Sequence, residues 1–139
     1  MPSSRSRGRE IAIQALYRLD LNPDTTAEEI DRFLAARLRG NATVGFARRL
    51  VGGVRERLKE LDAALDSRSE RWRVSRMAAT DRAILRLGIH ELLHGDVPGP
   101  VAVNEAIELA KRYGTEASAT FVAGILGRVL AERPAAAGG

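Results

Sequence analysis

The chain has 139 residues, of which 45% are hydrophobic, and this suits a single domain with its own core. No run approaches the roughly eighteen uninterrupted apolar residues of a membrane span, and the basic N-terminus lacks the apolar segment of a signal peptide. We therefore expect a cytoplasmic protein. The sequence contains no cysteine, which excludes disulfides, thiolate metal sites and a cysteine nucleophile.

The net charge of +4 suits an anionic partner, although basic proteins are common. Only Lys59 and Lys111 of the 22 basic residues are lysine. This bias fits guanidinium groups that bind phosphate, and it equally fits a GC-rich genome. Arg5, Arg7 and Arg9 lie in a segment without apolar side chains to anchor it. We expect residues 1–8 to form a flexible arginine-rich arm that an anionic partner orders.

Helical periodicity runs along the chain, and convincing strand alternation is found nowhere. The first predicted helix has one apolar stripe, formed by Ile11, Ala15, Leu16 and Leu19. It ends at Asn22 and Pro23. Thr25 or Thr26, with Glu28 or Glu29 three residues later, is a capping box that opens a second helix. The buried face of that helix is predicted to be Ile30, Phe33, Leu34 and Leu38.

A long third helix is predicted from Phe46 to Leu65, where apolar residues keep helical spacing over about five turns. The Gly52-Gly53 pair inside it costs about 2 kcal/mol in helix propensity, which indicates a close helix crossing more than a hinge. Residues 66–77 read as a short linker or a single turn, with Trp72 as the one large apolar side chain among several arginines.

Three further helices are predicted, over 78–94, over 101–113 and from 118 to just before Pro134. Gly95, Pro98, Gly99 and Pro100 predict the loop between the first two of these helices. The tail over 134–139 is of low complexity and is expected to be disordered. The pattern predicts an all-α fold, one compact domain over 9–133 with five to seven helices.

Catalytic motifs are not convincing. The glycines nowhere form a phosphate-binding loop. His90, Glu91 and His94 match the HExxH order of zinc proteases, but a third ligand in a suitable context is not evident. A histidine at the end of a helix also stabilises the last carbonyl groups. We therefore expect no enzyme activity, no metal site and no cofactor.

Several blocks in order carry a family resemblance. They are RxxAIQALYxxD over 9–20, DRAILRLGIHELL over 81–93, DVP over 96–98, VNEAIELAKRYG over 103–114 and SxxFVAGIL over 118–126. The chain resembles the NusB family of bacterial transcription antitermination factors from about residue 5 to residue 130. The resemblance implies about seven helices in two packed subdomains, no catalysis, and binding of boxA RNA and of NusE, a ribosomal small-subunit protein.

The resemblance also implies roles for individual residues. Arg5, Arg7 and Arg9 stand where the family's N-terminal arm contacts RNA phosphates, and Ser6 occupies a position that is commonly basic. Tyr17 resembles the aromatic residue that meets RNA bases. A tyrosine at the edge of the core is the alternative for that residue.

The resemblance implies roles for three further residues, Gln14, Phe121 and Asp81. Gln14 lies one turn before the aromatic residue on the same face, and Phe121 matches another residue of the RNA surface, with burial as its alternative. Asp81 corresponds to an acidic position on the NusE surface, although it would also favour the helix dipole without any partner. The family pattern is not followed at Ala117, Ala123 and Gly127; loss of an acid at Ala117 is expected to strengthen RNA binding.

The function expected from these residues is that of an adaptor, which holds RNA and NusE and modifies elongating RNA polymerase, notably in ribosomal RNA operons. Two alternatives belong to other classes. NusB-like domains also target ribosomal RNA methyltransferases to their substrate, and the chain could be a helical dimerisation domain. A homodimer is compatible with RNA binding and with autoinhibition.

Overall fold

The structure is a computed structural model that describes residues 3–132. This part of the chain contains seven α-helices, one short 3-10 helix and no strand. They are α1 (Ser4–Leu21), α2 (Ala27–Arg37), α3 (Asn41–Glu56), α4 (Leu58–Asp66), η1 (Val74–Arg76), α5 (Ala79–His94), α6 (Gly99–Tyr113) and α7 (Ser118–Glu132). The predicted all-α fold is confirmed. None of these helices has the length and apolar content required to cross a bilayer.

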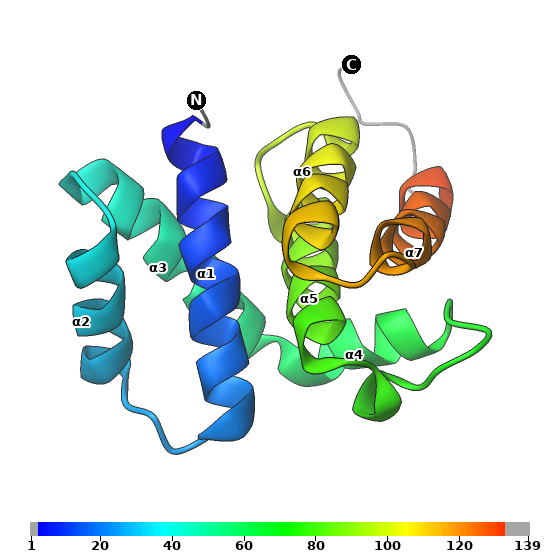
Figure 1. The fold of residues 1–139 in the computed structure, drawn as a ribbon, viewed down its shortest axis with the longest axis horizontal. Helices are drawn as coiled ribbons and strands as arrows, with labels where there is room; N and C mark the ends of the chain where they lie inside the picture. The colour runs from blue at the N-terminus through cyan, green and yellow to red at the C-terminus, as the bar shows by residue number, and fades with distance from the viewer. Residues whose placement is uncertain (1–2, 133–139) are drawn as a thin grey trace.

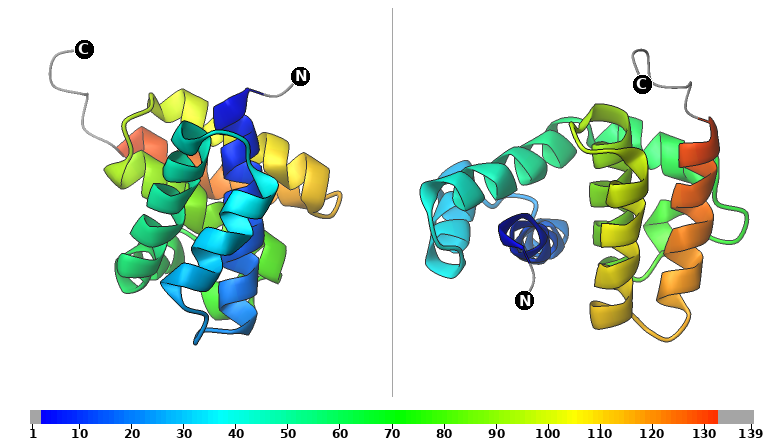
Figure 2. Two further views of the ribbon diagram at one scale, coloured as in Figure 1. Left: turned by 90° about the vertical axis from the view of Figure 1, so that its left-hand side faces the viewer. Right: turned by 90° about the horizontal axis from the view of Figure 1, so that it is seen from above.

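The helices form two subdomains, as expected. Figure 1 shows α1, α2 and α3 together on one side and α4 to α7 on the other. Helices α1 and α3 both pack on α5 where the two groups meet. In the view from above in Figure 2, α3 extends from the first group toward the second. The buried apolar side chains nevertheless form one cluster, from Leu34 of α2 to Leu126 of α7. The two groups therefore share a single core.

The arginine-rich segment is not a flexible arm in the part that the structure describes. Helix α1 begins at Ser4, because the Ser3 side chain caps it by accepting a hydrogen bond from the Ser6 backbone N–H at 3.1 Å. Ser6 then donates to both carboxylate oxygens of Glu105 on α6, at 2.9 and 3.1 Å. A cap and a long-range hydrogen bond thus order residues 3–8. Residues 1–2 and the expected tail over 134–139 lie outside the described range.

Helix α2 begins as the capping box predicts. The Thr26 hydroxyl accepts a hydrogen bond from the Glu29 backbone N–H at 3.1 Å, and the Thr26 hydroxyl also lies 3.2 Å from the Glu29 carboxylate. The expected buried face is largely confirmed: Ile30, Leu34 and Leu38 are buried, whereas Phe33 is partly exposed.

The predicted long third helix is wrong in its length. Arg57 leaves helical geometry with φ −107° and ψ 21°, and this break separates α3 from α4. Apolar spacing continues through the break, so periodicity alone did not reveal it. The close crossing expected at the glycine pair is confirmed at one position. A Cβ on Gly53 would lie 2.3 Å from Cε1 of His90 on α5, whereas Gly52 faces open space.

The second subdomain follows the sequence closely. The segment over 67–77, after the end of α4, contains only the single turn η1, and α5 and α7 lie where they are predicted. Helix α6 begins two residues earlier than expected, at Gly99, because Pro100 takes a position in the first turn where its missing N–H costs nothing. The loop before α6 is shorter as a result.

Ion pairs join the subdomains beside the apolar core. At the end of α1, Asp20 accepts hydrogen bonds from Arg82 of α5 at 2.6 Å. Arg86, one turn further along α5, also donates to Asp20, at 3.4 Å, and binds Asp62 of α4 within the second subdomain with two hydrogen bonds of 2.8 Å. These contacts fix the position of α1 on α5 and therefore the geometry of the surface that both helices share.

Candidate nucleic-acid interface

One face of α1 carries a polar stripe toward the second subdomain. Arg7, Glu10, Gln14 and Tyr17 follow one another at intervals of three or four residues and so lie on one side of the helix. Tyr17 is 41% exposed, so much of its ring is accessible at the surface. The stripe therefore presents a cation, an anion, an amide and an aromatic ring in line.

Tyr17 and Gln14 border a hollow of about 340 Å³ between the subdomains. We call it the Tyr17 hollow; its lining residues are Ile13, Gln14, Tyr17, Arg18, Phe33, Thr80, Ala83 and Tyr113. Most of these side chains are apolar or aromatic. Gln14 and Thr80 add hydrogen-bonding groups. Such a surface can receive a planar aromatic ligand and hydrogen-bond its edge.

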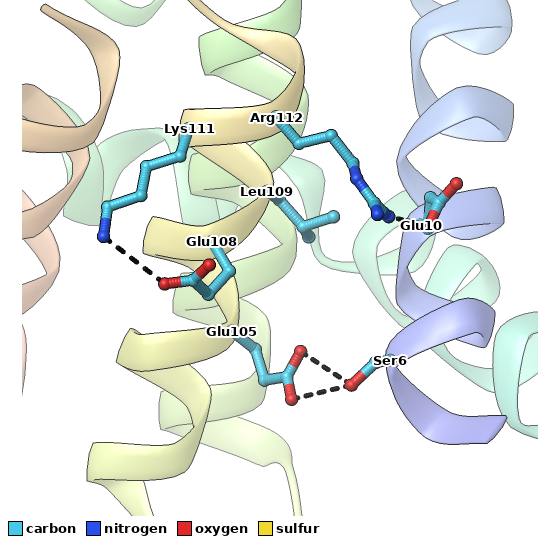
Figure 3. Close-up of a pocket in the computed structure, with 7 residues that line it drawn as sticks. All are labelled: Ser6, Glu10, Glu105, Glu108, Leu109, Lys111 and Arg112. Carbon is cyan, nitrogen blue, oxygen red and sulfur yellow. Dashed lines mark hydrogen bonds and ion pairs between the residues drawn. The ribbon is translucent and has the colours of Figure 1, made fainter. Parts of the chain in front are cut away.

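A second hollow, of about 510 Å³, lies further toward the N-terminus of α1, between α1 and α6. One of its lining groups is the Glu10 carboxylate, which accepts hydrogen bonds from Arg7, Arg112 and Tyr113. Figure 3 shows Arg112 reaching from α6 to Glu10 and Ser6 reaching from α1 to Glu105. Burial and the bond to Glu10 raise the pKa of Tyr113. The Glu10 carboxylate thus fixes Arg112 in the wall of the hollow and holds Arg7 beside it on α1.

The structure brings Phe121 and Asp81 together in a third hollow, of about 590 Å³, which we call the Phe121 hollow. Trp72 and Ala117 also line it, and both are exposed. Thr80 lines the Tyr17 hollow and the next residue, Asp81, lines this one. The two hollows therefore lie on either side of the first turn of α5.

The three N-terminal arginines have different environments. Arg5 is exposed, with its guanidinium 4.7 Å from the centre of the Phe46 ring and a nitrogen 3.6 Å from Asp96. Arg7 is also exposed, beside Glu10. Arg9 is only 3% exposed, because its Nε–H donates to the buried Glu91 carboxylate. The structure corrects the expected placement of Arg9: it lies in the interior and not on the surface with the other two.

The histidine pair has structural partners. The ring of His90 is buried against Gly53, and Nε2 of His94 lies 2.6 Å from the Glu60 carboxylate. Glu91, the acid of the HExxH order, binds Arg9. Burial is the main reason that the pKa of His90 falls to about 4, and the charges of His94 and Arg57 add to it. No group of three or more potential metal ligands occurs among residues 3–132.

Sequence reasoning missed three residues of this surface. Tyr113 and Arg112 end α6 beside Gly114, and only their spatial neighbours on α1 reveal that they border the stripe. Thr80 enters through the packing of α5 on α1. Trp72 was noticeable as an aromatic residue among arginines, but the sequence did not indicate its proximity to Phe121.

Comparison with known sequences gives a consistent result. A model described as the NusB family matches residues 6–131. The chain is 44% identical over 131 residues to the transcription antitermination protein NusB of Myxococcus xanthus, and the alignment covers 91% of this chain and 94% of that protein. It is 42% identical over 137 residues to the protein of the same name from Anaeromyxobacter dehalogenans, and the alignment covers 98% of this chain and 96% of that protein.

Solved structures agree with the sequences. NusB of T. maritima is 36% identical, with a TM-score of 0.83 over 96% of this chain and 94% of that one. A crystal structure of antitermination factors NusB and NusE in complex with dsRNA has a TM-score of 0.85, and the alignment covers 96% of this chain and 100% of that chain. Its identity is 23%, so this likeness concerns the fold alone. The match of the family model over nearly the whole chain and the identity to curated relatives show that the chain belongs to the NusB family.

Proposed function

We propose that this chain is a non-catalytic RNA-binding adaptor of bacterial transcription antitermination, which acts on the nascent transcript in the cytoplasm. It holds a boxA-type single-stranded RNA together with NusE and so modifies elongating RNA polymerase. The names of its curated relatives support the process. The solved complex of a similar fold with NusE and RNA supports the partners.

The observation that carries this proposal is the position of Tyr17. An exposed aromatic ring, with Gln14 one turn away, borders an apolar hollow of about 340 Å³. Single-stranded RNA exposes unstacked bases, and protein aromatic side chains bind these by stacking. Arg5 and Arg7 are exposed on the same helix and supply cations for phosphates. We assign Tyr17 and Gln14 to a base and these arginines to the backbone.

We assign the Phe121 hollow to the junction of RNA and protein partner. Phe121 offers a partly exposed ring to a second base, and Asp81 offers a carboxylate to NusE. These two residues line one hollow, so an RNA bound at Phe121 and a NusE molecule bound at Asp81 would contact each other there. Two ligands of one adaptor raise each other's effective concentration, which makes joint binding tighter than either alone.

The test measures binding of a labelled boxA-like RNA and of a scrambled RNA by fluorescence anisotropy, with and without NusE, at several salt concentrations. We expect tighter binding to the boxA-like RNA, enhancement by NusE, and loss of affinity with salt. Tyr17→Ala should weaken binding about tenfold, since one stacked base contributes about 1–3 kcal/mol. Leu93→Ala, which truncates a side chain of equal exposure on α5, is the control.

Two results would contradict the proposal. One is equal weak binding to both RNAs, which would leave a basic helical domain. The other is an unchanged affinity in Tyr17→Ala. Asp81→Asn should reduce the enhancement by NusE and leave the affinity for RNA alone unchanged, so the two partner surfaces can be separated.

A further inference from the structure

Phe33 of α2 has two arginines on its ring. The guanidinium carbon of Arg18, from the last turn of α1, lies 5.0 Å from the ring centre. That of Arg37, from the last turn of α2, lies 3.8 Å from the same centre. Stacking on an aromatic face restricts each guanidinium to a fixed position, and it leaves the N–H groups at the edge of the plane free to donate. One ring therefore contacts two cations from two different helices.

These two cations have no counter-charge in the part of the chain that the structure describes. No carboxylate oxygen among residues 3–132 lies within 4.0 Å of either guanidinium, whereas Arg48 on the neighbouring helix α3 pairs with Asp31 at 2.8 Å. The one hydrogen bond of Arg37 goes to the Phe33 carbonyl. Both side chains are exposed. Two unpaired guanidinium groups around one ring repel each other, and an anion bound by them would reduce that repulsion.

The cation pair adjoins the Tyr17 hollow. Arg18 and Phe33 are themselves part of its wall, opposite residues of the second subdomain such as Thr80. The hollow is apolar and holds about 340 Å³, enough for a nucleobase, and its polar groups are few. A ligand with a planar apolar part and an anionic group at one end matches this arrangement. The planar part would fill the apolar hollow, and the anionic group would contact the two arginines. An RNA nucleotide is such a ligand.

We propose that Arg18, Phe33 and Arg37 form a phosphate subsite for the RNA nucleotide whose base occupies the Tyr17 hollow. The phosphodiester of that nucleotide accepts hydrogen bonds from these guanidinium groups, and Phe33 holds both in place. The RNA strand consequently continues from α1 onto α2. This inference rests on the proposed RNA binding and adds to it a path for the strand and three residues that the sequence did not predict to contact RNA.

The test uses the full chain with Arg18→Gln and Arg37→Gln combined. We expect the affinity for a boxA-like RNA to fall about tenfold at 0.15 M salt, the size of one charge-assisted hydrogen bond. The slope of log affinity against log salt should become less steep by about 0.7 for each phosphate that the protein no longer neutralises. The control combines Arg32→Gln and Arg39→Gln, which removes the same charge from two exposed arginines that do not stack on Phe33. Thermal melting checks that both variants are folded.

A second readout uses RNA length. Wild type should gain affinity when the RNA is extended by the nucleotide that reaches the subsite, and the Arg18→Gln, Arg37→Gln variant should gain less, because it keeps only the contact with the base. Equal losses in the test and control variants would overturn the subsite and leave only a general effect of charge. Failure of this inference is distinguishable from failure of the proposed function: if wild type binds RNA and Tyr17→Ala weakens it, RNA binding stands whatever these arginines do.

Discussion

Arg9 and Glu91 form a buried ion pair between α1 and α5, in which one N–H of Arg9 is shared by both carboxylate oxygens at 2.9 and 3.0 Å. Each residue is 3% exposed, and Nη2 of Arg9 has no hydrogen-bond partner among residues 3–132. Burial raises the pKa of Glu91, and Arg9 opposes that rise. The pair therefore specifies how the two subdomains meet at a place where neither residue is solvated.

Removing one partner of this pair should be costly. Arg9→Met leaves a buried carboxylate unpaired, and we expect the free energy of unfolding to fall by about 3–5 kcal/mol. Arg9→Met combined with Glu91→Leu should recover most of that loss. Urea unfolding of the wild type, the single variant and the double variant measures these free energies. If Arg9→Met left the stability unchanged but weakened RNA binding, Arg9 would be an RNA contact after all.

The glycine pair in α3 offers a matched comparison. Gly53→Ala would place a methyl group 2.3 Å from the His90 ring, and we expect a loss of about 1–3 kcal/mol from overpacking. Gly52→Ala faces open space and should gain about 0.5–1 kcal/mol from helix propensity. Thermal or urea unfolding should show that the free energy of unfolding falls in Gly53→Ala and rises in Gly52→Ala. The same sign for both would show that α3 does not cross α5 closely at Gly53.

The stability of the protein should depend on the protonation of His90. Its pKa is about 4 in the folded chain and 6.5 in the unfolded chain, so the unfolded chain binds more protons between these values. The stabilisation is present above pH 6.5 and is lost as the pH falls toward 4. From pH 7 to pH 5 we expect the free energy of unfolding to fall by about 2 kcal/mol from this residue. His90→Gln should unfold with a weaker pH dependence, and an identical dependence would exclude His90 as the cause.

Ala117 tests the electrostatics of the RNA surface. It is exposed and lines the Phe121 hollow, so Ala117→Asp would place a negative charge beside bound RNA. We expect a lower affinity and a weaker dependence on salt. Ala63→Asp, on an exposed position of α4, makes the same change elsewhere. The idea fails if the two variants bind RNA equally well in the same titration.

Local sequence features predicted the elements well because their causes are local. The capping box at Thr26 and Glu29 involves residues three apart, and the structure contains it. The break at Arg57 was missed because the apolar spacing on both sides of it is in register. The interior position of Arg9 depends on a partner 82 residues away, so a segment of alternating arginine and small residues gave no sign of it.

The candidate site was predictable only in part, for the same reason. Tyr17, Gln14 and Asp81 came from family motifs, and the structure places them in two hollows on either side of the first turn of α5. Thr80, Tyr113 and the two arginines on Phe33 lie in or beside these hollows through packing between distant helices. A pattern within one helix cannot report such neighbours.

With RNA bound as proposed, the helical start of α1 fixes the distance between two RNA contacts. Arg7 and Tyr17 lie on one face of a single helix, about 15 Å apart along its axis at 1.5 Å per residue. A flexible arm would let a phosphate-binding cation meet a stacked base at any spacing. A rigid helix instead fixes how many nucleotides separate the two contacts. An RNA with one nucleotide inserted between them would have to bulge or give up one of these two interactions, so the spacing of its bases matters as much as their identity.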